Sequence, residues 1–160
     1  MAMVYILLGT NLGNREENLH QAIKNLDQET GKVLEKSSIY ETAAWGIEYQ
    51  PSFYNQVIKI NTDLSPEILL KKILEIELEM GRIRIKKWYT RLIDIDILYY
   101  DTILHNSSSL IIPHKEIPNR KFTLIPLVEI APDYIHPVYL KTNQELLNLC
   151  NDELEVKKVD

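Results

Sequence analysis

A run of alternating side chains, residues 92–100, constrains the fold of this chain more than any other stretch. Its odd positions predict one apolar face of a β-strand, formed by Ile93, Ile95, Ile97 and Tyr99. Asp94 and Asp96 then share the other face, because successive side chains of a strand point to opposite sides. At about 3.3 Å per residue their Cα atoms would lie roughly 6.6 Å apart. That spacing suits one or two bridging cations.

Two like charges side by side on a strand lower its stability unless something compensates them. Mg²⁺ takes one or two protein carboxylates and completes its shell with water and phosphate oxygens. Basic residues stand just upstream, at Arg82, Arg84, Lys86, Lys87 and Arg91. We therefore predict a metal–polyphosphate site, and we expect Leu92, Leu98 and Tyr100 beside the aspartates to enclose it partly. The alternative is a solvated strand face that carries two exposed acids.

Length and composition indicate one ordinary globular domain over residues 1–160, with 45% apolar and 26% charged residues. The net charge of −5 argues against general affinity for nucleic acid or an anionic membrane, although a local basic cluster can bind a small anion. Cys150 is the only cysteine, so no internal disulfide can form. The first apolar run is too short for a signal peptide or a membrane span. We expect a cytoplasmic monomer.

The order of predicted elements indicates the fold class. Strands are predicted at 4–8, 33–40, 55–63 and 92–100, and helices at 15–29, 66–80, 122–130 and 143–150. The first six elements read strand, helix, strand, strand, helix, strand, which is typical of an α+β, ferredoxin-like βαββαβ sandwich. The helices would cover one face of the sheet, with C-terminal additions beyond. The opposite face would be open, and Asp94 and Asp96 would project from it.

Turn and cap signals set the expected boundaries. Gly9 and Gly13 belong to a turn rather than to a Walker A loop, since no Gly-Lys-Ser/Thr follows them. Asn14 with Glu17 resembles a capping box at the start of the first helix. Gly81 is predicted to end the second helix.

Three further features have both a functional and a structural interpretation. The long segment 41–54 carries aromatic residues that can stack on a planar ring or cover the sheet edge as core: Trp45, Tyr49, Phe53 and Tyr54. His114, with an arginine and an aromatic soon after it, can line a pocket or be structural. Glu77 lies beside the apolar stripe of its helix, where it can face a ligand or pair with a surface lysine.

A set of motifs runs through nearly the whole chain in one order. It comprises Gly-Thr-Asn-Leu-Gly at 9–13, Tyr-Glu-Thr at 40–42, Asn55, Gly-Arg-Ile-Arg at 81–84, Lys-Trp-x-x-Arg-x-x-Asp-Ile-Asp-Ile-Leu at 87–98, Pro-His at 113–114 and Asn-Arg-x-Phe at 119–122. This set resembles the 6-hydroxymethyl-7,8-dihydropterin pyrophosphokinase family of folate biosynthesis. The Arg-x-x-Asp-x-Asp portion is far more specific than a single glycine motif.

The resemblance implies transfer of diphosphate from ATP to the hydroxymethyl group of the reduced pterin, with release of AMP. Asp94 and Asp96 would hold two Mg²⁺ ions, and Arg82 and Arg91 would act in catalysis from a loop that closes over the phosphates. The ATP site would comprise Glu77, Arg84, Arg91, His114 and Arg120. The pterin site would comprise Thr42, Ala43, Trp45, Phe53, Asn55, Trp88 and Phe122. Phe53 and Phe122 would sandwich the ring, and Asn55 would hydrogen-bond its edge.

The chain departs from the family pattern in two places. The usual Trp-Gly-Pro-Arg is Trp88-Tyr89-Thr90-Arg91, which affects how that loop closes, and Lys115 follows His114 where an aromatic or proline is commoner.

Two other functions are alternatives to this one. A ferredoxin-like RNA-binding or nucleotide-binding module would need a basic sheet face with exposed aromatics, where this chain has acids. A kinase that transfers a single phosphoryl group to another heteroaromatic alcohol would release ADP instead of AMP.

Overall fold

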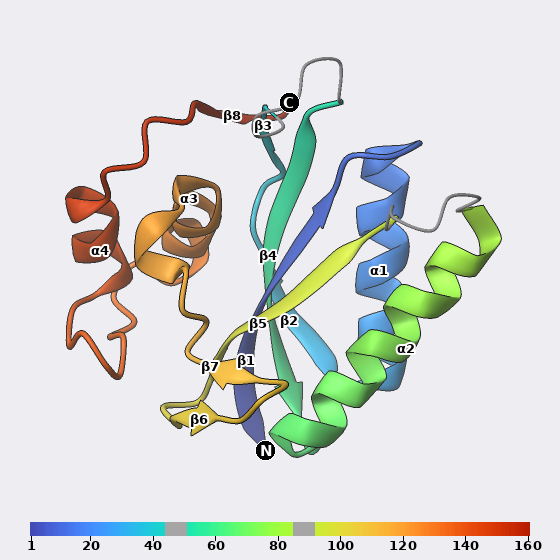
Figure 1. The fold of residues 1–160 in the computed structure, drawn as a ribbon, viewed down its shortest axis with the longest axis horizontal. Coiled ribbons are helices and arrows are strands. Elements are labelled where there is room, and N and C mark those ends of the chain that lie inside the picture. Colours follow the sequence, from blue (N-terminus) through green and yellow to red (C-terminus); the bar gives the residue numbers. More distant parts are fainter. Residues whose placement is uncertain (44–50, 85–91) are drawn as a thin grey trace.

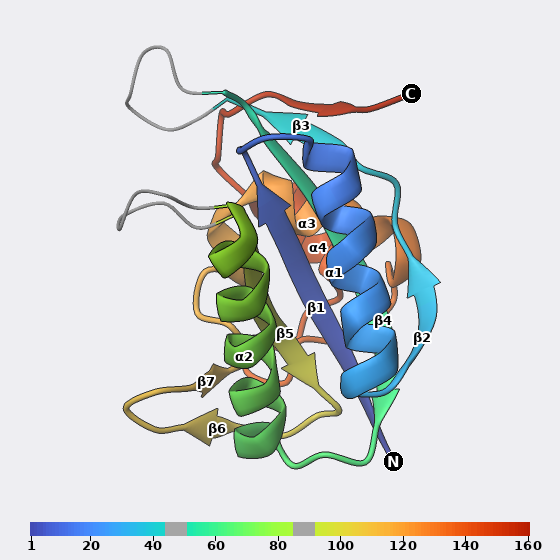
Figure 2. The same ribbon diagram turned by 90° about the vertical axis from the view of Figure 1, so that its right-hand side faces the viewer.

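An antiparallel sheet with helices on both faces organises the chain (Figures 1 and 2). The computed structural model describes residues 1–43, 51–84 and 92–160. Its strands are β1 (Ala2–Thr10), β2 (Lys32–Lys36), β3 (Tyr40–Thr42), β4 (Phe53–Thr62), β5 (Asp94–Tyr100), β6 (His105–Asn106), β7 (Ile111–Ile112) and β8 (Val156–Lys158). Its helices are α1 (Arg15–Glu29), α2 (Pro66–Arg84), α3 (Lys121–Ile130) and α4 (Asn143–Leu149), with a 3₁₀ turn η1 (Ile117–Asn119).

The strand order confirms the predicted fold class. The main sheet runs β5-β1-β4-β3-β8, β2 also pairs with β4, and neighbouring strands are antiparallel. Helices α1 and α2 cross between the strands of the βαββαβ unit and lie together on one face (Figure 1). This is the ferredoxin-like arrangement. It places β5, with the two aspartates, at one edge of the sheet.

The main core lies between the sheet and α1 and α2. Each helix contributes one buried stripe at helical spacing: Leu19, Ala22 and Leu26 from α1, and Leu69, Ile73, Ile76 and Met80 from α2. These side chains pack on the inward residues of the strands, including Ile6, Leu8, Ile58, Ile60 and Ile95. Burial of each large aliphatic side chain is worth roughly 1.5–3 kcal/mol relative to exposure. The apolar face of β5 packs in this core, and this packing fixes the position of the strand.

The sequence predicts that the second face of the sheet is open, but the structure leaves only part of that face uncovered. A second core lies there, in which Tyr5, Leu7 and Val57 pack against Leu124 and Leu127 of α3. Strand β1 is therefore apolar on both faces, and the second face needs its own cover. Helices α3 and α4 supply it (Figure 1). The part of this face that carries Asp94 and Asp96 stays accessible.

A bulge near the end of β5 makes part of the predicted alternation wrong. The register between β1 and β5 shifts so that Leu98 has no partner opposite it. Tyr99 consequently joins the second core with Leu98, instead of the helix side where alternation predicts it. Tyr100 packs with the helix-side core, as does Leu92, rather than beside the aspartates. The bulge cannot be read from the apolar run, because every residue around it is apolar.

The start of α1 agrees with the cap signal, but one glycine assignment is wrong. Asn14 is the N-cap, and its side chain accepts a hydrogen bond from the Glu17 N–H at 3.1 Å. Gly13 lies in the turn before it with a φ of 61°, which favours glycine. Gly9, in contrast, belongs to β1 and not to the turn.

Two other boundaries also differ from prediction. Helix α2 continues through Gly81 to Arg84, so the glycine does not end it. The predicted strand at 33–40 is divided into β2 and β3. At the break, the Ser37 hydroxyl accepts a hydrogen bond from the Val57 N–H at 2.9 Å, which replaces a ladder bond with a side-chain bond. Across the described ranges, no helix has the length and apolar character that a membrane span requires.

Candidate active site

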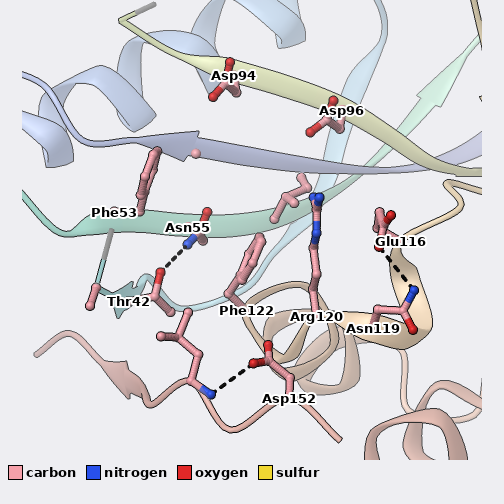
Figure 3. A pocket seen from close by; sticks show the side chains of 14 residues that line it. Thr42, Phe53, Asn55, Asp94, Asp96, Glu116, Asn119, Arg120, Phe122 and Asp152 are labelled. Atoms are coloured by element: carbon pink, nitrogen blue, oxygen red, sulfur yellow. Dashed lines mark hydrogen bonds between the residues drawn. The ribbon is translucent and has the colours of Figure 1, made fainter. Parts of the chain in front are cut away.

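Asp94 and Asp96 lie side by side on the same face of β5, as the alternation predicts. In the register, Asp94 pairs with Gly9 of β1 and Asp96 pairs with Leu7. Both carboxylates are half-buried and both line one cavity of about 510 Å³ (Figure 3). The adjacent isoleucines point into the helix-side core, so their packing sets the direction of the carboxylates. That Asp94 and Asp96 bind a metal remains a prediction.

The cavity lies on the second face of the sheet, beside α3 and the C-terminal residues. Its lining comprises Leu7, Gly9, Thr42, Ala43, Phe53, Asn55, Asp94, Asp96, Glu116, Asn119, Arg120, Phe122, Asp152 and Leu154. All the pterin-site residues that the sequence predicts within the described ranges are in this set. The two predicted metal ligands are in it as well. Residues from far apart in the chain therefore meet at one site.

Asn55 and Thr42 form a buried polar pair in the floor of the cavity. Asn55 Nδ2 donates to Thr42 Oγ1 at 3.3 Å, and both residues are 4% exposed. Gly9 stands opposite Asn55 on β1, and a β-carbon there would be 2.9 Å from Asn55 Oδ1. Only glycine leaves the Asn55 amide its present position. A buried amide presents both a donor and an acceptor, which can recognise the edge of a heteroaromatic ring.

Two phenylalanines reach the cavity from different elements. Phe53 begins β4 and Phe122 lies in the first turn of α3. In Figure 3, Asn55 lies between the two rings. The guanidinium of Arg120 is 5.5 Å from the centre of the Phe122 ring, within range of a cation–π contact. Aromatic walls on either side of an amide suit a flat, polar ligand.

Of the predicted ATP-site residues whose side chains are described, Arg120 lines the cavity. Arg120 extends from the start of α3 toward the strand that carries Asp96 (Figure 3). Burial lowers the pKa of His114, while the Asp96 carboxylate opposes this and Arg120 adds to it. His114 is therefore predominantly neutral at pH 7. Its Nδ1 accepts from the Glu116 N–H at 3.1 Å, which leaves the proton on Nε2 as a donor.

Two predicted ATP-site residues do not line the cavity. His114 is not among the lining residues, and its backbone N–H donates to the Leu98 carbonyl. Glu77 lies at the edge of β5 and accepts a hydrogen bond from the Ile95 N–H at 2.8 Å. That N–H lies between the two aspartates in the chain. Glu77 thus supports the strand that carries the metal candidates, and its contact with ATP remains a prediction.

Several predicted residues cannot be placed. Trp45, Trp88 and Arg91 lie outside the described residues. The departures at Tyr89, Thr90 and the loop around them lie outside as well. Arg82 and Arg84 belong to the last turn of α2, which is described as backbone only.

The described lining is strongly acidic. Its carboxylates are Asp94, Asp96, Glu116 and Asp152, against the single guanidinium of Arg120. Asn119 Nδ2 donates to Glu116 at 3.1 Å, and backbone N–H groups donate to Asp152. A polyphosphate entering this cavity would be repelled unless cations accompanied it.

The donor set near Asp94 and Asp96 fits Mg²⁺. Within the described ranges, no group of three or more His, Cys, Asp or Glu side chains could hold a metal ion. An all-protein cage, which Zn²⁺ or Ca²⁺ would favour, is therefore not formed by these residues. A pair of carboxylates facing an open cavity is what Mg²⁺ uses when substrate phosphates complete its shell.

Sequence reasoning missed several lining residues. Gly9 was assigned to a turn, and Glu116 and Asn119, between His114 and Arg120, were given no role. Asp152 and Leu154 follow the last predicted helix and were not considered. Their alternation with Asn151, Glu153 and Glu155 was a weak strand signal that could have drawn attention to them.

A ferredoxin-like sandwich whose open face joins paired carboxylates, two phenylalanines and a buried amide has the groups that a phosphoryl-transfer enzyme for an aromatic substrate needs. Comparison with known proteins makes this specific. The sequence model of the 7,8-dihydro-6-hydroxymethylpterin-pyrophosphokinase (HPPK) family matches residues 5–132. The chain belongs to the HPPK family.

Similar proteins support the assignment. The 2-amino-4-hydroxy-6-hydroxymethyldihydropteridine pyrophosphokinase of Aquifex aeolicus is 43% identical over 145 residues, which cover 91% of this chain and 90% of that protein. The folic acid synthesis protein fol1 of Pneumocystis carinii is 44% identical over 135 residues, or 84% of this chain but only 18% of that much longer protein. A crystal structure of Plasmodium falciparum HPPK-DHPS has a TM-score of 0.75 at 18% identity, covering 92% of this chain and 43% of that one. The last comparison shows the fold alone.

Proposed function

We propose that this chain transfers the diphosphate group of ATP to the hydroxymethyl group of 6-hydroxymethyl-7,8-dihydropterin and releases AMP. The observation that carries the proposal is one cavity that joins Asp94 and Asp96 to Phe53, Asn55 and Phe122. Membership of the HPPK family supports ATP as the co-substrate and the reduced pterin as the acceptor.

The aromatic end of the cavity would bind the pterin. A pterin is flat and carries hydrogen-bond donors and acceptors along its edge. Phe53 and Phe122 would stack on its faces, and Asn55 would bond its edge while Thr42 holds the amide. Ala43, Trp45 and Trp88 would complete this wall, although the two tryptophans are not among the residues that the structure describes. This orientation would direct the hydroxymethyl group toward the aspartates.

The acidic end would bind the triphosphate. Asp94 and Asp96 would hold two Mg²⁺ ions, which when bound would neutralise the phosphate oxygens. Arg120 would add a guanidinium there. From the family pattern we propose the same phosphate-binding role for Arg82, Arg84 and Arg91. His114 would donate through its Nε2 proton, and Glu77 would lie on the same side. The chain's contribution is to hold charges and to align the two substrates.

The chemical step requires no covalent intermediate on the protein. The hydroxymethyl oxygen forms a bond to the β-phosphorus of ATP, and the bond between that phosphorus and the α–β bridging oxygen breaks. AMP leaves with that oxygen. The hydroxyl proton passes to Asp96 or to solvent. In-line alignment is the main requirement of such a transfer.

The remaining expectations are part of the same proposal. We take residues 1–160 as a single pyrophosphokinase domain that acts as a cytoplasmic monomer. The acidic cavity does not favour nucleic acid, because RNA binding to a ferredoxin-like sheet relies on exposed aromatics with a basic surround. We therefore propose small-molecule substrates alone, with neither a nucleic-acid nor a membrane partner.

The test is incubation of the chain with ATP, Mg²⁺ and 6-hydroxymethyl-7,8-dihydropterin, followed by chromatography of the nucleotides. The expected product is AMP in a one-to-one ratio with pterin diphosphate. ADP with pterin monophosphate would instead indicate a single-phosphoryl kinase. The proposal is overturned if adding the pterin causes no loss of ATP.

A further inference from the structure

The C-terminal segment, residues 151–158, is built into the sheet and into the cavity. Its exposure alternates: Asp152, Leu154 and Val156 face the body, while Asn151, Glu153 and Glu155 face solvent. The segment ends in β8, which pairs with β3 (Figures 1 and 2). This alternation is that of an extended strand with one buried face.

Asp152 caps α3, the helix that carries Phe122. Arg120 is the N-cap of α3 but makes no side-chain capping bond. The Lys121 N–H donates instead to Asp152 Oδ2 at 3.0 Å, across 31 positions of sequence. A carboxylate at a helix N-terminus is stabilising, because the first N–H groups have no partner within the helix. The cap lies between Arg120 and Phe122, which both line the cavity.

The same carboxylate sets the position of Leu154. The Leu154 N–H donates to Asp152 Oδ1 at 3.0 Å (Figure 3). The two oxygens of one carboxylate therefore bond the start of α3 and the backbone of the C-terminal segment. Leu154 itself lines the cavity. Two positions later, Val156 pairs with Thr42 in the β3–β8 register. The segment therefore contacts both walls of the predicted pterin site.

The other end of α3 has a separate anchor. Glu129 accepts hydrogen bonds from the Ser38 N–H at 3.0 Å, the Ser38 hydroxyl at 2.8 Å and the Tyr40 hydroxyl at 2.6 Å. None of these residues lines the cavity. Glu129 and Asp152 thus hold opposite ends of one helix, and only the Asp152 end borders the site.

We propose that the C-terminal segment is part of the substrate site: Leu154 contacts the pterin ring, and Asp152 is a positioning residue that sets Phe122 and Arg120. The identity of the substrate rests on the proposed function. The apolar side chain of Leu154 favours a flat aromatic ligand over a charged one. Leu154 accordingly acts on the pterin and not on ATP.

Steady-state kinetics of two matched pairs of variants test this. Leu154→Ala is expected to raise the pterin KM about fivefold while the ATP KM changes less than about twofold. Its control, Leu149→Ala, removes a leucine that is 61% exposed at the end of α4 and should leave both KM values unchanged.

Asp152→Ala is expected to raise the pterin KM at least about threefold, and Asp152→Asn to restore most of the loss, since asparagine is also a good cap. The control, Glu129→Ala, should lower the melting temperature without moving the pterin KM. A merely structural role of Asp152 would make the two alanine variants alike in KM. That likeness, or a pterin KM in Leu154→Ala equal to that of Leu149→Ala, overturns the inference.

Failure of the proposed function would be seen separately. If the wild-type chain releases no AMP, calorimetric titration with 6-hydroxymethylpterin tests the segment by binding alone. Weaker binding by Leu154→Ala than by Leu149→Ala supports the inference even then. Equal binding by the two variants, or no binding by the wild type, overturns it.

Discussion

Gly9 lies directly opposite Asn55 in the β1–β4 register, and a β-carbon on Gly9 would be 2.9 Å from Asn55 Oδ1. On its other side Gly9 pairs with Asp94. This one glycine separates the predicted pterin-binding amide from the predicted metal ligand. It serves close approach between strands, and its backbone needs no unusual conformation.

Gly9→Ala should therefore impair pterin binding before it impairs the fold. The added methyl group displaces the Asn55 amide and its bond to Thr42. We expect the pterin KM to rise about tenfold, with a stability loss of about 1–2 kcal/mol, in steady-state kinetics and urea unfolding respectively. An unchanged pterin KM would show that Asn55 does not contact the substrate.

The stability of the chain should fall at acid pH through His136. This residue is 2% exposed, and burial lowers its pKa to about 4. Its Nδ1 accepts from the N–H groups of Val138 and Tyr139, so the folded state keeps it neutral. An unfolded histidine binds its proton below about pH 6.5. The unfolded state thus gains protons first, and about 3 kcal/mol of stability should be lost between pH 6.5 and 4.

His136→Asn should reduce this pH dependence, because asparagine can accept the same two hydrogen bonds and does not titrate. The measurement is the free energy of unfolding in urea at pH 7 and pH 4.5. Burial lowers the pKa of His114 as well, so some acid sensitivity should remain in the variant. An identical slope in wild type and variant would refute the assignment to His136.

Glu77 should affect the metal site through the strand rather than by direct contact. Its carboxylate accepts from the Ile95 N–H, the backbone group between Asp94 and Asp96. Glu77→Ala removes that acceptor, so we expect the Mg²⁺ concentration for half-maximal activity to rise about threefold and stability to fall by about 1 kcal/mol. Glu77→Gln keeps an oxygen acceptor and should lie nearer to wild type. Glu79→Ala, on the exposed side of α2, is the control, and equal effects in Glu77→Ala and Glu79→Ala would contradict this role.

The sequence was most informative where one periodic pattern decided the structure. Asp94 and Asp96 share a face because Ile95 between them, with Ile93 and Ile97 on either side, has to be buried, and this is readable without coordinates. Tyr99 was misplaced because a one-residue bulge reverses the alternation, and an apolar run does not reveal a bulge. Gly81 was read as a stop, but α2 continues to Arg84, since a glycine inside a helix lowers its stability without having to end it.

The site was predictable in its chemistry and less so in its extent. Asn55 and Phe122 were found through the family motifs and Phe53 as an aromatic of the segment 41–54, and all three line the cavity. Asp152 and Leu154 were not found, since the strand signal around them is weak and a cap contributed from 31 positions away leaves no sequence signal beside α3. Gly9 was misread for a similar reason: a glycine in a strand and a glycine in a turn look alike until the opposing residue is known.

The central claim is that Asp94 and Asp96 together bind the cations needed for diphosphate transfer. The most direct measurement is AMP release by an Asp94→Asn, Asp96→Asn double variant over a range of Mg²⁺ concentrations, with unfolding followed in parallel. The account predicts that turnover falls at least about a hundredfold at every Mg²⁺ concentration, because both charges are gone while the shape is kept. AMP release by the folded double variant at a rate near that of the wild type would contradict it.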